Sequence, residues 1–507
     1  MTRPGFTLEV DERTGPLLVV QGTGVSMRRF GLGTQVAYPA DPTPAGDPRA
    51  DVSAALDRPV DGEPLAARLT PATRLTVVVG GGDLVRPAMV DDLRRVMVEE
   101  VLSRAASARV DDVEILVATG LGRRLGQEEL VGLLGERVVR SFAPRGALRC
   151  HDVTTDAAPL GTVGGHEIRL NPRIAASDLV VNVALRTDAR GLGDDQLALG
   201  LGDAATIDHL AGLDADPGAR AEAAQLVAAA VPVLTLEAAV GNPALQGPLS
   251  FVSQREWNWG VRDRAAVAAV RRALSAWPKQ ATQRIFGDVT ARYGLLAVAS
   301  GSAGAVDDLT RSAWLGDHLV RVPAAAGVLV TSVWGQGNDN TSPAGDPLGA
   351  AHDALVGQGE SYVGRRPVTD PAVFVGMHPL REQFSTRHDS AAADFFSDVL
   401  SATTDPRRIR DEYQDRFADD AWYADLYQNR GAHHPLRVFH RWYATAGAAE
   451  AYSAVIWVGA RRASAARMGF RAASTLDDAL EIAADKVGAD PIVTVVHSGA
   501  QIALELA

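Results

Sequence analysis

Residues 115–130, ILVATGLGRRLGQEEL, decide the fold class of this 507-residue chain. Residues 113–118 end in four successive apolar residues, which is typical of a strand buried on both faces of a sheet. Residues 127–134 have the apolar spacing of a helix. A glycine-rich loop with Arg123 and Arg124 connects the two. A buried strand, a short loop and a helix in this order indicate a parallel sheet covered by helices.

The same alternation of strands and helices continues along the chain. Strands are predicted at 75–79, 179–183 and 295–299, and a second series at 327–331, 372–375, 454–458 and 492–496. A helix is predicted at 89–104, and a capping-box pattern around Thr475 begins the last one. The first 50 residues predict β structure and a proline-rich loop. We therefore expect an α/β protein of two α/β domains with mainly parallel sheets, at 1–310 and 318–507.

The composition excludes several classes of protein. A hydrophobic share of 46% with a charged share of 22% is ordinary for a folded chain, and the net charge of −12 disfavours nucleic-acid and anionic-membrane partners. No apolar stretch reaches about 18 residues, and the first residues lack the apolar core of a signal peptide. We expect a cytoplasmic protein. The single cysteine, Cys150, excludes an internal disulfide and a cysteine-cluster metal site.

Residues 405–443 are both charged and aromatic. The rings in this segment are Tyr413, Phe417, Trp422, Tyr423 and Tyr427. The pattern predicts an amphipathic helical hairpin whose rings pack on the domain, and stacking of these rings on a ligand is the alternative.

Several segments resemble the nickel-pincer-dependent lactate racemase family. Residues 77–87, VVVGGGDLVRP, resemble its opening strand with Asp-x-Thr-Arg-Pro, and residues 115–130 resemble its second motif. Residues 54–59, 176–181 and 455–496 are similar to further elements of the family. The resemblance extends over about residues 50–500 and implies two lobes around an interdomain cleft.

The resemblance also implies a racemase or epimerase site, but its reactive residues differ here. Two histidines exchange the substrate proton in the family, and their positions are Gly122 and Leu185 in this sequence. The lysine that tethers the nickel-pincer nucleotide falls near Asp195, and two polar cofactor contacts become apolar around residues 347–357. His209 is the counterpart of a nickel-ligating histidine, two residues early. Lactate racemase activity itself is therefore not expected, and the cofactor stays open.

Ligands of parallel α/β sheets bind beyond the carboxyl ends of the strands, so the loops there hold the candidate substrate-binding residues. These residues are Asp83, Arg86, Arg123, Arg124, Arg186, Trp334 and Asn338. Arginine binds carboxylates through two parallel hydrogen bonds, which favours an anionic substrate. The alternatives are surface ion pairs for the arginines and a helix cap for Asp83.

The candidate acid/base residues are histidines in the same loops. His209, His378 and His388 with Asp389 are the choices, since a histidine beside a carboxylate makes a general base. His433 and His434 are expected to cap or pack the aromatic helix, and His497 follows the last strand without a specific signal.

These features predict an enzyme that acts on a small anionic hydroxylated substrate, such as a hydroxy acid or a sugar acid. Its reaction would be of isomerase/epimerase or lyase type, with acid/base groups relocated from the family's positions. Two alternatives remain. One is a cofactor-independent enzyme of another reaction class in specialised metabolism, and the other is a non-catalytic protein that binds small anions. No nucleotide-loop, serine-hydrolase or zinc-protease motif is present.

Overall fold

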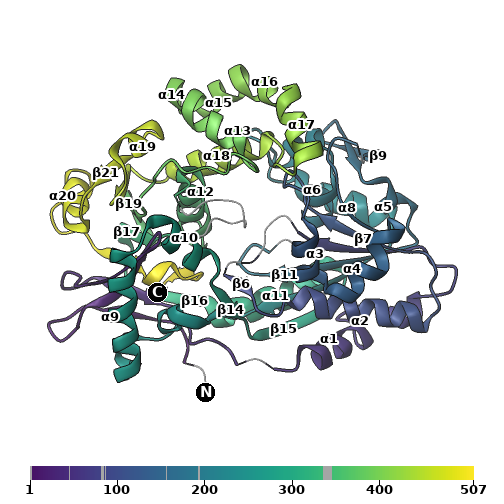
Figure 1. Ribbon diagram of the computed structural model, residues 1–507, viewed down its shortest axis with the longest axis horizontal. Helices are drawn as coiled ribbons and strands as arrows, with labels where there is room; N and C mark the ends of the chain where they lie inside the picture. The colour runs from purple at the N-terminus through teal and green to yellow at the C-terminus, as the bar shows by residue number, and fades with distance from the viewer. Residues whose placement is uncertain are drawn as a thin grey trace.

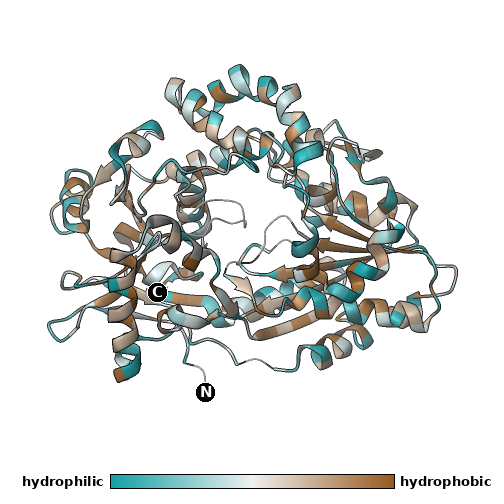
Figure 2. Cartoon of the chain, viewed as in Figure 1, coloured by the Kyte–Doolittle hydropathy of each residue, from teal (hydrophilic) through white to brown (hydrophobic). Residues whose placement is uncertain are grey.

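The computed structural model describes residues 3–44, 46–81, 85, 87–155, 157–191, 195–334 and 345–507. The chain forms two lobes, each built on a sheet, and a group of helices arches over the gap between them (Figure 1). In both lobes the strands are the most apolar elements and the outer helices carry the polar residues (Figure 2). No helix of the described residues is long and apolar enough to cross a bilayer.

The first lobe contains a six-stranded sheet in the order β15-β12-β11-β5-β7-β8. Its strands are β5 (Leu75–Gly80), β7 (Val113–Ala118), β8 (Leu148–Cys150), β11 (Leu179–Arg186), β12 (Val233–Val240) and β15 (Leu295–Gly301). All neighbours are parallel except β15, which pairs antiparallel with β12. The four predicted strands of this series are confirmed. The sequence missed β12, which is buried beside β11.

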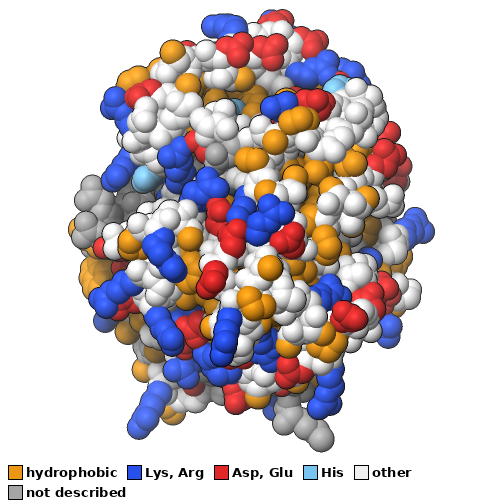
Figure 3. All heavy atoms as spheres, turned by 90° about the vertical axis from the view of Figure 1, so that its right-hand side faces the viewer, with side chains coloured by type: hydrophobic (Ala, Val, Ile, Leu, Met, Phe, Trp, Pro, Cys, Tyr) orange, Lys and Arg blue, Asp and Glu red, His pale blue; other side chains and the backbone are white. Residues whose placement is uncertain are grey.

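The helices of this lobe lie around the sheet. They include α1 (Pro48–Asp57), α2 (Leu93–Ser107), α3 (Gln127–Leu134), α4 (Glu136–Phe142), α5 (Pro172–Ala176), α6 (Asp195–Leu201), α7 (Ala204–Ala211), α8 (Ala219–Ala230) and α11 (Ala303–His318). The predicted helix at 127–134 is confirmed as α3, and the one at 89–104 begins four residues later as α2. On the outer face of this lobe, acidic and basic side chains are interspersed (Figure 3).

The second lobe contains a seven-stranded sheet in the order β1-β4-β22-β17-β19-β20-β21. Its strands are β1 (Phe6–Glu9), β4 (Gln35–Tyr38), β17 (Ala326–Ser332), β19 (Val368–Met377), β20 (Ala454–Val458), β21 (Arg471–Ala473) and β22 (Val493–Val496). Because β4 pairs in parallel with β22 and antiparallel with β1, these two N-terminal strands belong to this lobe. The sequence predicted these strands at the start of a first domain of residues 1–310, and the structure places them in the sheet of the second lobe.

A smaller body adjoins both lobes. It joins the hairpin β2 (Leu17–Gln21) and β3 (Gly24–Arg28) to residues 244–293, which include η3 (Gly247–Ser253), η4 (Glu256–Asn258), α9 (Val261–Ala276) and α10 (Lys279–Gly287). Leu18, Val20, Leu249, Phe251 and Phe286 form its core. Segments more than 200 residues apart are thereby brought together.

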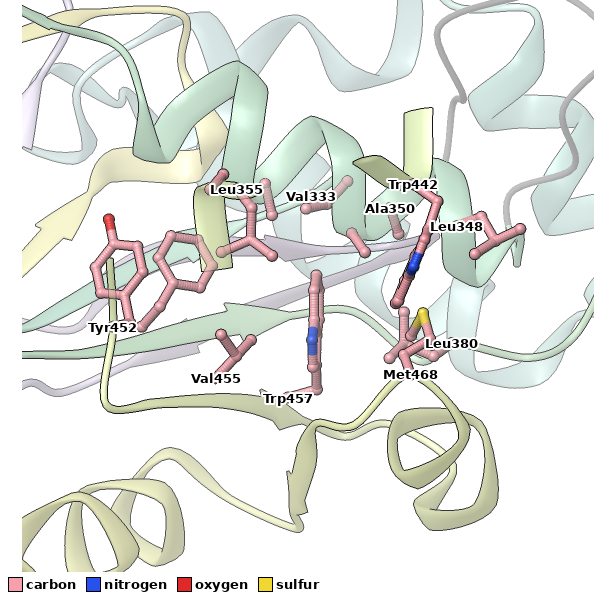
Figure 4. Close-up of a cluster of buried hydrophobic side chains, with 14 of the residues drawn as sticks. Val333, Leu348, Ala350, Leu355, Leu380, Trp442, Tyr452, Val455, Trp457 and Met468 are labelled. Atoms are coloured by element: carbon pink, nitrogen blue, oxygen red, sulfur yellow. The ribbon is translucent and has the colours of Figure 1, made fainter. Parts of the chain in front are cut away.

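Two helices of the second lobe stand on a large apolar cluster. α12 (Pro347–His352) and α18 (Leu436–Ala449) contribute Leu348 and Trp442, which lie above Trp457 of β20 in Figure 4. The Trp442 indole also donates to the Thr404 carbonyl oxygen at 3.3 Å. The cluster therefore fixes the position of α18 and of the side chains on its other face.

The predicted capping box and helical hairpin are present. Thr475 Oγ1 accepts a hydrogen bond from the Asp478 amide at 3.1 Å and begins α20 (Leu476–Val487). The aromatic segment forms α15 (Pro406–Ile409), η7 (Arg410–Gln414), α16 (Asp415–Ala418), α17 (Ala421–Arg430) and α18. Four of its five rings pack inward, which confirms packing for them, while Trp422 is 55% exposed.

Candidate functional site

A cavity of about 640 Å³ lies between the two lobes and the smaller body. Its first-lobe wall comes from the carboxyl ends of β5, β7 and β11, as expected for a parallel sheet. Gly122 and Leu185 both line it. These are the positions that the resemblance gives to the family's proton-transfer histidines. The cavity is therefore the candidate site, and neither of these two positions carries a side chain that can transfer a proton.

One histidine of the cavity is bound to a carboxylate of the opposite lobe. His440 of α18 lines the cavity, and its Nε2 lies 2.7 Å from Oδ1 of Asp208 on α7. Burial opposes ionisation of Asp208, but the hydrogen bond and charge of His440 outweigh it and lower the pKa of that carboxyl. Gln414 holds the other oxygen of Asp208 at 3.2 Å and accepts from the Tyr443 hydroxyl at 2.7 Å. This chain of hydrogen bonds fixes the His440 ring.

The spacing of α18 places two arginines beside His440. His440 and Arg441 follow Arg437 by three and four residues, so they lie on its face of the helix, and all three line the cavity. The opposite face, with Phe439 and Trp442, packs into the apolar cluster. Arg437 Nη1 also lies 3.9 Å from Asp389 Oδ2. The helix therefore presents an imidazole flanked by two guanidinium groups.

A second histidine–carboxylate pair lies in another part of the wall. Nε2 of His497, in η8 (His497–Gly499), lies 2.8 Å from Oε1 of the buried Glu256. Oε2 of Glu256 accepts from the Tyr38 hydroxyl at 3.0 Å, and the Tyr38 ring stacks on His497. Burial would raise the pKa of Glu256, but the bond from His497 outweighs it and lowers that pKa. Both rings line the cavity.

Two further histidines line the cavity, and each lies 3.5 Å or more from the carboxylate of a neighbour in sequence, Asp317 or Asp353. Burial lowers the pKa of His318 to about 4, and its Nδ1 is 3.1 Å from the Trp314 carbonyl oxygen. His318 is therefore neutral near pH 7. His352 of α12 has its Nδ1 3.7 Å from Oδ1 of Asp353.

A buried acid begins α12. Asp346 accepts a hydrogen bond from the Leu348 amide at 2.9 Å and so caps the helix. Burial, with the charge of nearby Asp389, raises the pKa of Asp346 to about 7. The carboxyl therefore changes its protonation state near neutral pH.

The predicted arginines within the described residues bind carboxylates of the protein itself. Arg186 is fully buried, lies 3.2 Å from Glu237 and pairs also with Asp307. Arg123 pairs with Glu129, and Arg124 pairs with Asp152. None of these three described arginines lines the cavity. The structure therefore corrects their proposed contact with the substrate, because carboxylates of the protein hold all three guanidinium groups outside the cavity wall.

The predicted acid/base residues also lie outside the cavity wall formed by the described residues. The His209 ring stacks on His166 of β10 (His166–Leu170) at 4.0 Å between centroids. His378 Nδ1 accepts from the Leu380 amide at 3.2 Å, and His388 Nδ1 lies 2.8 Å from the Gly431 carbonyl oxygen. Asp389 precedes α13 (Ser390–Asp394) near Arg437. The structure thus places other histidines, His440 and His497, in the wall.

One predicted ligand-contacting residue lines the cavity. Trp334 does so, and its indole donates to the Ser498 carbonyl oxygen at 2.8 Å. Asp83, Arg86 and Asn338 lie outside the described residues.

The described residues do not fit the nickel-pincer nucleotide that the resemblance implies. His209, the candidate nickel ligand, packs on His166 rather than in the cavity wall. Gly349 is buried within α12 where the family has a polar contact.

Sequence reasoning missed the cavity-lining residues of α18. The signal was present as a polar stripe, Arg437, His440 and Arg441, on a helix whose other residues are largely apolar or aromatic. His440 was hidden because its carboxylate partner, Asp208, is 232 positions away.

Comparisons with known proteins agree with this geometry. Residues 32–185 match the family model of the lactate racemase N-terminal domain, a span that includes both Gly122 and Leu185. The lactate racemase apoprotein from Thermoanaerobacterium thermosaccharolyticum is similar in structure, with a TM-score of 0.62 and 15% identity over 96% of this chain and 99% of that one. A protein from Thermotoga maritima has a TM-score of 0.49 and 12% identity, over 92% of this chain and 100% of that one. No curated protein matches the sequence. The chain therefore has the fold of the lactate racemase apoprotein, and its residues 32–185 are similar to the lactate racemase N-terminal domain.

Proposed function

We propose that the protein is an isomerase or epimerase of small anionic hydroxylated substrates, with its acid/base groups relocated within the lactate racemase-like cleft. The observation that carries this proposal is the His440–Asp208 pair, at 2.7 Å, in a cavity whose two family proton-transfer positions are Gly122 and Leu185. The imidazole that those positions lack is supplied by α18.

His440 is the proposed proton-transfer residue. A carboxylate only accepts hydrogen bonds, so Nε2 carries the hydrogen that bonds to Asp208. In the neutral ring the basic lone pair is then on Nδ1. Asp208 holds this tautomer and stabilises the imidazolium that forms when Nδ1 takes a proton from carbon.

The two arginines of α18 are the proposed anion site. Arg437 and Arg441 lie one helical turn from each other, on either side of His440, and both line the cavity. A substrate carboxylate held there stabilises the negative charge that develops when the adjacent carbon loses its proton. This arrangement favours hydroxy acids and sugar acids over neutral sugars.

Hydrogen exchange tests the reaction. Enantiopure 2-hydroxy acids and aldonic acids are incubated with the protein in D2O, and α-deuteration is followed by proton NMR and inversion by chiral chromatography. Wild type is expected to exchange and invert at least one acid, and His440→Gln is expected to invert it more slowly by about 100-fold or more. His166→Gln, an exposed histidine of β10 outside the cavity wall, is the matched control.

The outcomes separate the alternatives. Inversion at the wild-type rate by His440→Gln contradicts the role of His440. Tight binding of the acids by a wild type that exchanges none of them contradicts catalysis and favours the small-anion-binding protein.

Binding of oxalate tests the anion site independently of turnover. Arg441→Met is expected to weaken oxalate binding about tenfold or more, because a charged hydrogen bond contributes about 1.5–3 kcal/mol. Arg462→Met, at an exposed position of α19 (Arg462–Arg467), is the control. Calorimetry measures both variants, and equal affinity of Arg441→Met and wild type would exclude this site.

A further inference from the structure

We infer that His497 is a second catalytic acid/base residue of this cavity, with Glu256 as its positioning residue. This inference rests on the proposed function. His497 follows the last strand of the seven-stranded sheet, whereas His440 is on α18, so two separate elements each bring an imidazole to one cavity. Inversion at carbon needs two such groups, because the proton leaves from one face and returns to the other.

The hydrogen bonds of Glu256 define the tautomer of His497. Glu256 accepts from the Leu18 amide at 2.6 Å, from the Tyr38 hydroxyl at 3.0 Å and from His497 Nε2 at 2.8 Å. The carboxylate is buried and ionised, since these bonds lower its pKa against the effect of burial. Nε2 of His497 therefore carries hydrogen, and Nδ1 is the site that takes or gives the reacting proton.

The backbone that carries His497 is strained. Ser498 has φ 49° and ψ 27°, a left-handed conformation that is uncommon for residues other than glycine. Gly499 follows with φ 65°, and a Cβ there would collide with the Ser332 carbonyl oxygen. Such strain persists only where the surroundings over-determine it, and it clusters at functional sites.

Three contacts hold this strained turn in place. Trp334 Nε1 donates to the Ser498 carbonyl oxygen at 2.8 Å, Gln358 Nε2 to the Gly499 carbonyl oxygen at 3.3 Å, and Ser498 Oγ to the Leu18 carbonyl oxygen at 3.3 Å. The imidazole itself is only 5% exposed and stacks on Tyr38 with 4.1 Å between centroids. The ring is thus fixed before any ligand enters, as acid/base catalysis requires.

The proton balance of the reaction is closed by the two histidines. Neutral His440 Nδ1 removes the proton from the carbon next to the substrate carboxylate, and the C–H electron pair passes into that carboxylate to give an enediolate. Protonated His497 donates the hydrogen on its Nδ1 to the other face of the carbon, and the carboxylate is restored. The opposite enantiomer uses the two residues in exchanged roles, so no oxidant or reductant is consumed.

The stereochemistry of exchange tests the inference. For an acid that wild type inverts, His497→Gln is expected to slow inversion by about 100-fold or more. The same variant keeps α-deuteration of one enantiomer at the wild-type order of magnitude, because His440 still removes that proton. The retained exchange also shows that the variant is folded. His440→Gln is expected to keep exchange of the other enantiomer only.

Glu256→Asp and His166→Gln complete the set. Glu256→Asp keeps the negative charge but shortens the reach to His497, and it is expected to lower kcat for inversion with KM unchanged. His166→Gln is expected to invert at the wild-type rate. If His497→Gln inverts the acid at the wild-type rate while His440→Gln does not invert it, the role of His497 is overturned and the role of His440 is kept. A wild type that exchanges none of the acids overturns the proposed function and this inference with it.

Discussion

At the scale of single residues, the partner of a charge decides its role. Arg186 had the sequence context of a substrate-binding arginine, but it is buried against Glu237, whose own pKa burial raises. The sequence around Arg186 does not indicate that Glu237, 51 positions away, is its partner. His440 shows the converse, since it becomes a candidate acid/base residue only through Asp208.

Arg186→Met is expected to be strongly destabilising. It leaves Glu237 buried without its cation, which costs about 3–5 kcal/mol in the free energy of unfolding. Arg74→Met removes an ion pair with Asp178 in which both side chains are about half exposed and screened by solvent, so it should destabilise the chain far less than Arg186→Met. Urea unfolding measures the free energy of unfolding of both variants. Equal values for the two would show that the buried ion pair of Arg186 contributes no more to stability than the exposed pair of Arg74.

At the scale of elements, continuous apolar runs predicted most of the strands. A few polar residues, such as the capping box at Thr475, predicted where a helix begins. Strands β7 and β20 begin and end where the sequence predicts. β12 was missed because Pro232 separates two apolar segments that form one helix and one strand, α8 and β12, and periodicity does not divide them. The packing of the aromatic face of α18 was predicted from the sequence. The role of its opposite face was not, because the cavity that this face lines is formed together with the other lobe.

The cap of α12 makes the stability depend on pH. Asp346 binds its proton more tightly in the folded chain, with a pKa of about 7, than in the unfolded chain, where the value is near 3.8. Its contribution is therefore fully present below about pH 4 and is lost as the pH rises to 7. Asp346→Asn retains a capping side chain and does not titrate. Unfolding measured against pH should show the variant to be more stable than wild type at about pH 8, relative to their difference at about pH 4. A constant difference would contradict the raised pKa.

At the scale of the whole molecule, the two lobes share the chain unevenly. Because β4 lies between β1 and β22, deletion of residues 1–41 turns β22 into an edge strand. Hydrogen exchange should then become faster in β22 and β17, while β5, β7 and β11 of the other sheet keep their protection. Loss of protection throughout the first lobe, with β22 unchanged, would contradict this division. The expected boundary at residue 310 did not anticipate it, since two short N-terminal strands give no local sign of which sheet they join.

The pairing of Gln35 with Thr494 also sets an order of events during synthesis. The inner strands of the six-stranded sheet, β5, β7, β11 and β12, have all emerged by residue 240, whereas β4 waits for a neighbour that follows it by 459 positions. Contacts between such distant positions form slowly, because a long loop must close first. We therefore expect the six-stranded sheet to form before the seven-stranded sheet is closed, so that the part of the cavity wall that follows β22 is assembled after the part from the first lobe.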